Sequence, residues 1–257
     1  MKLRLSRPLA ALGFAAIWAM SSQPVAAEGA GDMSQTQRES MRTEFRAYLL
    51  EHPEVIMEAI QVLELRRKEA EATSEAGMVS SISEDLRNDG YSFVAGNPDG
   101  DVTVVEFTDY NCGYCKRAHE DVKALIRMDP NVRLVIKEFP ILGPSSRIAA
   151  EAAMAAIAQQ GGDAYLEFND LMMKNRGALD EATVYQLAER AGLDVGLLRS
   201  DARDPKIAKN LARTSALAQK LRIEGTPTFV IGDQIVRGFV PLKDLQAAVA
   251  EQRANKG

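Results

Sequence analysis

Cys112 and Cys115 are the residues whose type and spacing most directly predict chemistry. They are the only cysteines among 257 residues and stand three positions apart in the sequence Cys-Gly-Tyr-Cys. The β-branched run 102–107 precedes them and a run with helix periodicity follows, so we expect the pair where a buried strand leads into a helix. The N-terminus of a helix offers free N–H groups and the positive end of the dipole, which favour a thiolate. The pattern predicts a redox pair in which Cys112 is the nucleophile and Cys115 the resolving thiol.

A structural disulfide and half of a zinc site are the two other roles considered for this pair. A structural zinc ion needs four ligands. The nearest additional candidate, His119, lies seven residues beyond Cys112, which is ~10 Å along a helix. A fourth ligand is missing nearby, since His52 belongs to another segment. Redox chemistry is therefore favoured, and His119 is interpreted as a surface histidine rather than a general base.

The first 27 residues have the pattern of a secretory signal peptide. Basic residues precede an apolar run from Leu9 to Met20, and the run Val25-Ala26-Ala27 resembles a cleavage site. The apolar run holds about 12 residues, fewer than the ~20 that an uncleaved membrane anchor needs. We expect a mature chain that begins at Glu28 and is exported to the periplasm, where disulfides form and persist.

The charge balance argues against a nucleic-acid partner. The chain has 31 Lys and Arg against 36 Asp and Glu, a net charge of −5, and no dense basic cluster interleaved with aromatic residues. Two cysteines are also too few for a small disulfide-stapled protein.

Residues 28–76 predict an N-terminal helical segment that ends in a linker. Apolar residues recur there at steps of three and four, which indicates helix. Pro53 disfavours a helical residue before it, so we expect two helices, roughly 34–51 and 53–71. The periodicity is lost over 72–77, which we interpret as a hinge or linker.

Residues 77–257 predict one α/β domain with a long helical insertion. The expected order is strand, helix, strand, helical insertion, strand pair and last helix. The expected ranges are strands 91–95, 102–107 and 132–138, helices 82–88 and 113–128, an insertion over about 141–221 broken at 161–162, 177 and 192, the strand pair 228–231 and 234–237, and a helix from 241 to about 253.

Together these features resemble the thioredoxin fold in its DsbA-like form, in which a helical domain is inserted before the last two strands. Glu106 stands six positions before the first cysteine, where that family places a buried carboxylate. Thr226-Pro227 before a β-run resembles the family's cis-proline loop, and 137–143 resembles its exit from the second core strand. The resemblance covers about residues 82–257.

The resemblance implies roles for seven residues. A cis X-Pro bond would let Thr226 present its backbone beside the Cys112 sulfur, where an extended substrate can pair. Glu106 would move the proton of Cys115 with a raised pKa. A trans proline and a solvated Glu106 are the simpler alternatives. The implied residues are Cys112, Cys115 and Glu106 in catalysis and Gly113, Tyr114, Thr226 and Pro227 in substrate binding, with no cofactor beyond the Cys112–Cys115 disulfide.

The residues around the pair favour isomerase or reductase chemistry over oxidation. Tyr114 stands where strongly oxidising DsbA proteins have His, and Thr before the proline resembles the isomerase DsbC. Residues 45–56 resemble the N-terminal segment of ScsC proteins, some of which form trimers that shuffle disulfides. We therefore expect a homo-oligomer, such as a trimer, that acts on unfolded or wrongly paired exported proteins and is reduced by a membrane partner of the DsbD or ScsB type.

Other functions remain open from the sequence. A DsbA-like dithiol oxidase recharged by a DsbB-type partner is the alternative within the same chemistry, and a monomer whose N-terminal helices cap its own domain is the alternative to an oligomer. A copper protein that holds Cu(I) between Cys112 and Cys115 belongs to another class. A non-catalytic holdase fits the helical segment but leaves the cysteine pair unexplained.

Overall fold

The computed structural model describes residues 33–159 and 162–255. The predicted signal peptide and the start of the mature chain lie outside the described residues. The chain divides into two units, 1–60 and 61–257, and each is described by itself.

The first unit is helical. Helix α1 (Gln35–Glu51) begins at a capping box in which Ser34 and Gln37 bond each other's backbone N–H groups, and it contains no buried residue. Helix α2 (Glu54–Ser81) begins after Pro53. The two predicted helices are therefore present, and Pro53 separates them as expected.

Helix α2 is longer than the sequence predicted. It continues through 72–77, so the predicted loss of helix there is wrong. Residues 68–76 are mostly Lys, Glu and Ala, which are strong helix formers even without an apolar stripe. The end of α2 belongs to the second unit, in which Val79 is buried and the Glu75 carboxylate lies 2.7 Å from the Arg237 guanidinium.

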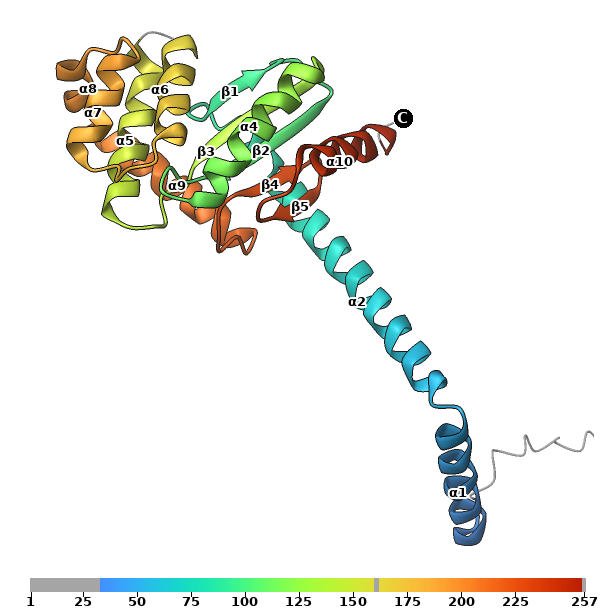
Figure 1. Cartoon of the computed structure of the whole chain (residues 1–257). Coiled ribbons are helices and arrows are strands. Elements are labelled where there is room, and N and C mark those ends of the chain that lie inside the picture. Colours follow the sequence, from blue (N-terminus) through green and yellow to red (C-terminus); the bar gives the residue numbers. More distant parts are fainter. Residues whose placement is uncertain (1–32, 160–161, 256–257) are drawn as a thin grey trace, which may run out of the picture. The chain divides into compact units, whose positions relative to one another are not determined.

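The second unit is built on one five-stranded sheet in the order β1-β3-β2-β4-β5 (Figure 1). Strands β2 and β3 pair in parallel and the other pairs are antiparallel. The central strand β2 is buried along nearly its whole length, as its β-branched sequence predicts. The strands are β1 (Phe93–Gly96), β2 (Val102–Thr108), β3 (Val132–Glu138), β4 (Thr228–Ile231) and β5 (Gln234–Arg237).

Helices cover both faces of the sheet. Helices α4 (Gly113–Met128) and α10 (Leu242–Ala254) pack on each other and on one face. The opposite face is covered by the end of α2, by α3 (Ser83–Arg87) and by the end of α9. Alternation along β2 places Val105 and Phe107 on the second face and Val104 on the first. Glu106 and Thr108 therefore share the α4 face.

The chain between β3 and β4 forms the predicted helical insertion. Its first helix is Ala-rich, and small side chains let neighbouring helices approach it closely. The loops that contain Gly177 and Gly192 separate helices, as expected. The insertion consists of α5 (Pro144–Gln159), α6 (Gly162–Lys174), α7 (Glu181–Arg190), α8 (Val195–Asp201) and α9 (Pro205–Lys220). This order of strands and helices confirms the predicted fold class. Among the described residues, no helix has the length and apolar character needed to cross a membrane.

Candidate active site

Cys112 caps the N-terminus of α4. Strand β2 ends at Thr108, and four residues later the Cys112 sulfur accepts the backbone N–H of Cys115 at 3.3 Å. The Cys112 N–H donates to the Asp109 carbonyl at 3.0 Å, which closes the loop between strand and helix. The sequence thus places Cys112 where the free N–H groups of a helix start face its sulfur.

The Asp109 carboxylate holds this loop through hydrogen bonds to backbone N–H groups. The sequence did not predict this role. One oxygen accepts the N–H of Asn111 at 2.8 Å, and the other accepts the N–H groups of Ile141 and Leu142 at 2.9 and 3.1 Å. Asp109 is buried. It therefore ties the Cys112 loop to the loop after β3. An Asp two residues before an N–H donor is typical of an Asx turn, the one signal that could have indicated this role.

The surroundings of Cys112 stabilise its thiolate. A hydrogen bond from the Cys115 thiol is the largest contribution that lowers the pKa of Cys112 to about 5, and partial burial opposes it. The Thr226 side chain and the N–H groups of Cys115 and Tyr114 lower the pKa further. When protonated, the Cys112 thiol donates to the Thr226 carbonyl at 3.1 Å.

Cys115 has the opposite character. Its side chain is fully buried. Burial first, and then its hydrogen bond to Cys112, raises the pKa of the Cys115 thiol well above its ordinary value. The pair therefore combines a thiolate at the helix start with a protonated thiol one turn inside.

Glu106 is buried beneath the pair, and its predicted burial is found. Its side chain is 5% exposed. Burial, and next the charge of Cys112, raises the pKa of Glu106 to about 7. A carboxyl group with such a pKa can both accept and release a proton near neutral pH.

The loop before β4 lies beside Cys112. The Thr226–Pro227 peptide bond is cis, and β4 pairs with β2 so that Thr228 stands opposite Phe107. The Pro227 carbonyl accepts the N–H of Gly238 at 2.9 Å. This pairing brings the Thr226 backbone to the Cys112 sulfur from more than a hundred residues away in the sequence.

An exposed aromatic surface adjoins Cys112. Gly113 is exposed and the Tyr114 side chain is 59% exposed. The Arg117 guanidinium lies 5.3 Å from the centre of the Tyr114 ring and 5.7 Å from that of Phe239. Exposed aromatic side chains of this kind suit contacts with apolar chain segments, and the cation–π contacts hold the rings in place.

His119 is not the surface histidine that the sequence predicted. Its side chain is only 12% exposed, and its Nε2 lies 3.0 Å from Asp170 of α6. Helix α4 packs against α6, which covers the side chain. Burial lowers the pKa of His119, and the contact with Asp170 opposes this.

The acidic groups near His119 are already paired with lysines. His119, Glu120 and Asp170 bring three potential ligand atoms within 4.8 Å of one another. Asp170 pairs with Lys123 and Lys174, and Lys174 also approaches Glu120. This cluster is therefore an ion-pair network between α4 and α6. The two cysteine sulfurs remain the donor set suited to a soft metal ion.

A family model described as a DSBA-like thioredoxin domain matches residues 103–250, which is more than half of the chain. The chain belongs to the DsbA-like thioredoxin family. A second model, described as the copper resistance protein ScsC N-terminal domain, matches residues 37–70. The resemblance predicted from the cysteine pair and the N-terminal segment is confirmed.

Solved structures of DsbA-like proteins resemble this chain. A thioredoxin-like oxidoreductase from Silicibacter pomeroyi is 47% identical with a TM-score of 0.64, and the match covers 68% of this chain and 98% of that one. ScsC of Proteus mirabilis in a transitional conformation is 30% identical with a TM-score of 0.64, covering 87% and 100%.

Two curated relatives each match more than half of this chain. Disulfide bond formation protein D of Bacillus subtilis is 24% identical over 173 residues, which cover 63% of this chain and 78% of that protein. A Na(+)/H(+) antiporter NhaA of Salinispora arenicola is 35% identical over 158 residues, 61% of this chain. The chain spans about a quarter of that antiporter's length, 24%.

Proposed function

We propose that this chain is a thiol–disulfide oxidoreductase that acts on disulfides of other proteins, as an isomerase or a reductase. The observation that carries the proposal is the Cys112 sulfur, whose pKa is lowered to about 5 and which lies 3.1 Å from the Thr226 carbonyl. A thiolate is the attacking species in disulfide exchange. Here it stands beside a backbone segment that a substrate chain can follow.

The reaction proceeds in two exchanges. The Cys112 thiolate attacks one sulfur of a substrate disulfide, forms a mixed disulfide and expels the other sulfur as a thiolate. Glu106 then accepts the Cys115 proton, and the Cys115 thiolate attacks Cys112, which releases the reduced substrate and leaves a Cys112–Cys115 disulfide. In isomerisation a substrate thiolate attacks the mixed disulfide instead, and Cys112 leaves as a stabilised thiolate.

The low pKa of Cys112 favours the reduced pair, because the thiolate is stabilised only when the disulfide is open. Isomerisation requires the reduced pair at the start of each cycle. The cycle therefore needs a thiol reductant, and a membrane donor of the DsbD or ScsB type fits this need. Gly113, Tyr114, Thr226 and Pro227 form the docking surface for the substrate.

Reactivation of scrambled ribonuclease tests this function. The reduced full-length mature chain is expected to restore activity, whereas Cys112→Ser is expected to abolish it. Cys115→Ser retains the attacking thiolate and is expected to trap mixed disulfides. Oxidation of reduced ribonuclease by the disulfide form, measured in parallel, identifies the alternative dithiol oxidase. Efficient oxidation without reactivation would overturn the isomerase proposal.

Copper binding is the second candidate function. The observation that favours it is the match of residues 37–70 to a domain named for a copper resistance protein, together with two free thiols that suffice for linear Cu(I). Titration with Cu(I) under reducing conditions compares the wild type with Cys112→Ser. Equal affinities would remove this function.

We further propose that the chain works as an exported homo-oligomer. The predicted signal peptide supports export to the periplasm. Helix α1 buries none of its residues, yet it presents Phe45 at 60%, Tyr48 at 50% and Leu49 at 36% exposure. Exposed apolar faces of this kind are typical of interfaces. Association would place several Cys112 thiolates around one substrate and raise their effective concentration.

A further inference from the structure

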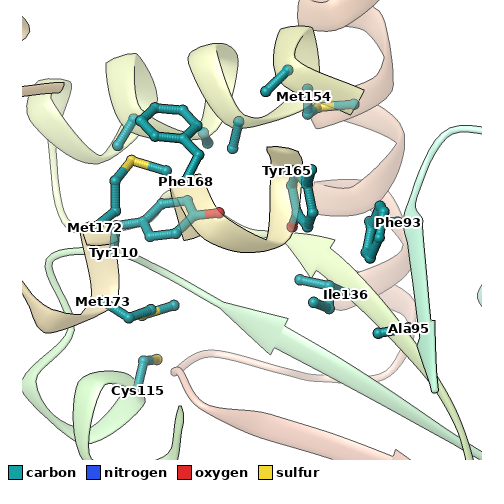
Figure 2. Close-up of a cluster of buried hydrophobic side chains, with 14 of the residues drawn as sticks. Phe93, Ala95, Tyr110, Cys115, Ile136, Met154, Tyr165, Phe168, Met172 and Met173 are labelled. Atoms are coloured by element: carbon teal, nitrogen blue, oxygen red, sulfur yellow. The ribbon is translucent and has the colours of Figure 1, made fainter. Parts of the chain in front are cut away.

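Glu138 is a buried carboxyl group that the proposed mechanism does not use. It ends β3 and is 5% exposed. The hydroxyl groups of Tyr110 and Tyr165 both donate to its Oε1, at 2.8 and 3.0 Å, and Asn169 donates to the Tyr110 hydroxyl at 3.0 Å. Figure 2 shows the Tyr110 and Tyr165 rings in the layer of side chains next to the insertion helices.

The other oxygen of Glu138 belongs to a residue that is paired in the sheet register with Thr108. Among the described residues, Glu138 Oε2 and Thr108 Oγ1 are both buried and make no hydrogen bond. The parallel pairing of β2 and β3 puts Thr108 opposite Glu138 and Glu106 opposite Ile136. Glu106, Thr108 and Glu138 therefore share one face of the sheet, with Thr108 between the two acids.

A cavity of about 300 Å³ adjoins this face. Its lining includes the buried Glu106, Thr108 and Asn169 and the exposed Asp163 and Glu167. Buried polar atoms without partners beside a space of this size are the usual sites of internal water. Water there would bond the Thr108 hydroxyl and the Glu106 carboxyl group. Glu138 does not line the cavity, so Thr108, its partner in the register, would join the two carboxyl groups, whose Cα atoms are separated by roughly 8 Å.

We propose that Glu138 is a positioning residue linked to Glu106 through Thr108 and cavity water, and that its ionisation shifts the pH at which Cys115 reacts. This inference rests on the proposed function. The Cys115 S–H bond breaks as Glu106 takes the proton; the Cys115–Cys112 bond forms as the bond to the substrate sulfur breaks and that sulfur leaves as a thiolate. The proton then leaves the Glu106 carboxyl group by way of the cavity water while Glu138 stays protonated, and no electrons move in that transfer.

The groups that face Glu138 determine the pH at which it ionises. Burial is the main cause that raises the pKa of Glu138 to about 8, and the charges of Asp109 and Glu106 add to it. The hydrogen bonds from Tyr110 and Tyr165 lower the pKa but do not outweigh burial. Since burial and the Cys112 charge raise the pKa of Glu106 only to about 7, Glu138 holds the proton more tightly.

Helices α4 and α6 also bring titratable side chains to this face. Helix α4 contributes Cys115 and, along the same cavity, His119 and Lys123. Helix α6 contributes Asp170, which is paired with both His119 and Lys123. His119, Lys123 and Asp170 form an ion-pair network, and Arg127 of α4 and Asp163 and Glu167 of α6 also line the cavity. Glu138 is a buried carboxyl group on the same face of the sheet as Glu106.

The pH dependence of the Cys115 step tests the inference. The full-length chain is prepared with glutathione bound to Cys112, and the release of glutathione is followed by acid quench and mass spectrometry. Glu138→Gln keeps an oxygen that accepts both tyrosine hydroxyls but carries no charge. Because Glu138 ionises at higher pH than Glu106, the lower midpoint of the rate profile is expected to stay near that of the wild type. The upper limb, in which the ionised Glu138 raises the pKa of Glu106, is expected to disappear.

Two further variants separate this role from packing. Tyr165→Phe removes a donor to Glu138 and leaves its carboxyl group, so the upper limb is expected to move to higher pH even if Glu138→Gln does not fold. Glu189→Gln, at an exposed carboxyl group on α7, is expected to match the wild type. Active Glu138→Gln or Tyr165→Phe variants that keep the wild-type upper limb, or rates lowered equally at every pH, would overturn the inference, whereas a wild type unable to release glutathione would overturn the proposed function itself.

Discussion

The two sulfurs of the pair differ in chemistry although they are three residues apart. The Cys112 sulfur accepts N–H groups of the helix start, whereas Cys115 is enclosed by the core and its thiol donates a hydrogen bond to Cys112. This hydrogen bond favours the thiolate of Cys112 and the protonated thiol of Cys115. The attack of Cys112 on a substrate disulfide can therefore proceed at neutral pH. The attack of Cys115 on the mixed disulfide first requires a group that accepts the Cys115 proton.

Alkylation by iodoacetamide is expected to report this difference. The reduced chain is expected to lose one thiol with a midpoint near the Cys112 pKa of about 5. Cys115→Ala removes the hydrogen bond that lowers this pKa most, so its midpoint is expected at higher pH. Mass spectrometry across the pH range gives both midpoints. Equal reactivity of the two thiols in the folded chain would contradict the assignment.

Glu106→Gln is expected to slow the second exchange specifically. The amide cannot take the Cys115 proton, and general bases contribute on the order of 100-fold or more to such steps. Mixed disulfide between Cys112 and glutathione is therefore expected to accumulate, as measured by mass spectrometry after acid quench. Alkylation of Cys112 serves as the control and is expected to remain fast. Unchanged release of glutathione would rule out this role for Glu106.

Sequence and structure agree at the residue scale where function depends on local sequence. The positions of Cys112 at the helix start and of Cys115 one turn inside follow from a strand that leads into a helix. The burial of Glu106 follows from its place in that strand. Glu138 and Asp109 could not be assigned in this way, because their partners come from α6 and from the loop after β3. Residue types alone do not say which side chains meet across a sheet.

Among the elements, those with strong turn chemistry were predicted best. Strands 228–231 and 234–237 match β4 and β5 residue for residue, because Gly232-Asp233 fixes the turn between them. Helix α2 was predicted to end near 71 but continues to Ser81. Its helix-forming residues and the burial of Val79 outweigh the lost periodicity and the ~1 kcal/mol cost of Gly77.

Strand β3 is anchored by a buried ion pair. The Lys137 side chain is fully buried and pairs with Asp89, which is itself 3% exposed. Its Nζ also donates to the Asp85 carbonyl at 3.0 Å. The pair connects the sheet to the segment after α3.

Lys137→Met is expected to lower the free energy of unfolding by about 3 kcal/mol, because it leaves the Asp89 carboxylate buried without its cation. Urea unfolding of the oxidised full-length chain measures the loss. Adding Asp89→Asn to Lys137→Met removes the unpaired buried charge. The double variant is expected to recover part of the lost free energy of unfolding. A double variant whose loss equals the sum of the single losses would show that the two side chains are not coupled.

For the molecule as a whole, redox state and pH are coupled through Cys112. Its pKa is about 5 when folded and ~8.5 in an unfolded chain. The unfolded state binds more protons between these values, so this group adds stability as pH rises through the window and loses it as pH falls toward 5. The disulfide form lacks the titration.

The stability of the reduced form relative to the oxidised form is therefore expected to grow between about pH 5 and 8.5, by at most about 1.4 kcal/mol per pH unit. Glu106 and Glu138 lower stability with rising pH in both forms and largely cancel in the difference. Urea unfolding of the reduced and oxidised forms at several pH values measures the difference between their free energies of unfolding. A difference that stays flat would mean that Cys112 is protonated at neutral pH.

Association through α1 is the last property that belongs to the whole molecule. Phe45 and Leu49 lie one turn apart on the same side of α1, and Thr43 lies on the opposite side. Glutamates at Phe45 and Leu49 would place charges in the proposed interface. The mass from light scattering is therefore expected to fall to that of one chain, while Thr43→Glu keeps the wild-type mass.

Activity separates association from chemistry in these variants. Phe45→Glu with Leu49→Glu is expected to reactivate less scrambled ribonuclease per thiol, because isolated thiolates lose their high effective concentration. Alkylation of Cys112 is expected to stay unchanged, since the catalytic residues lie in the other unit. If the wild type has the mass of a single chain, or if the monomeric variant reactivates ribonuclease fully, the N-terminal helices serve another purpose and isomerisation depends on the Cys112 site alone.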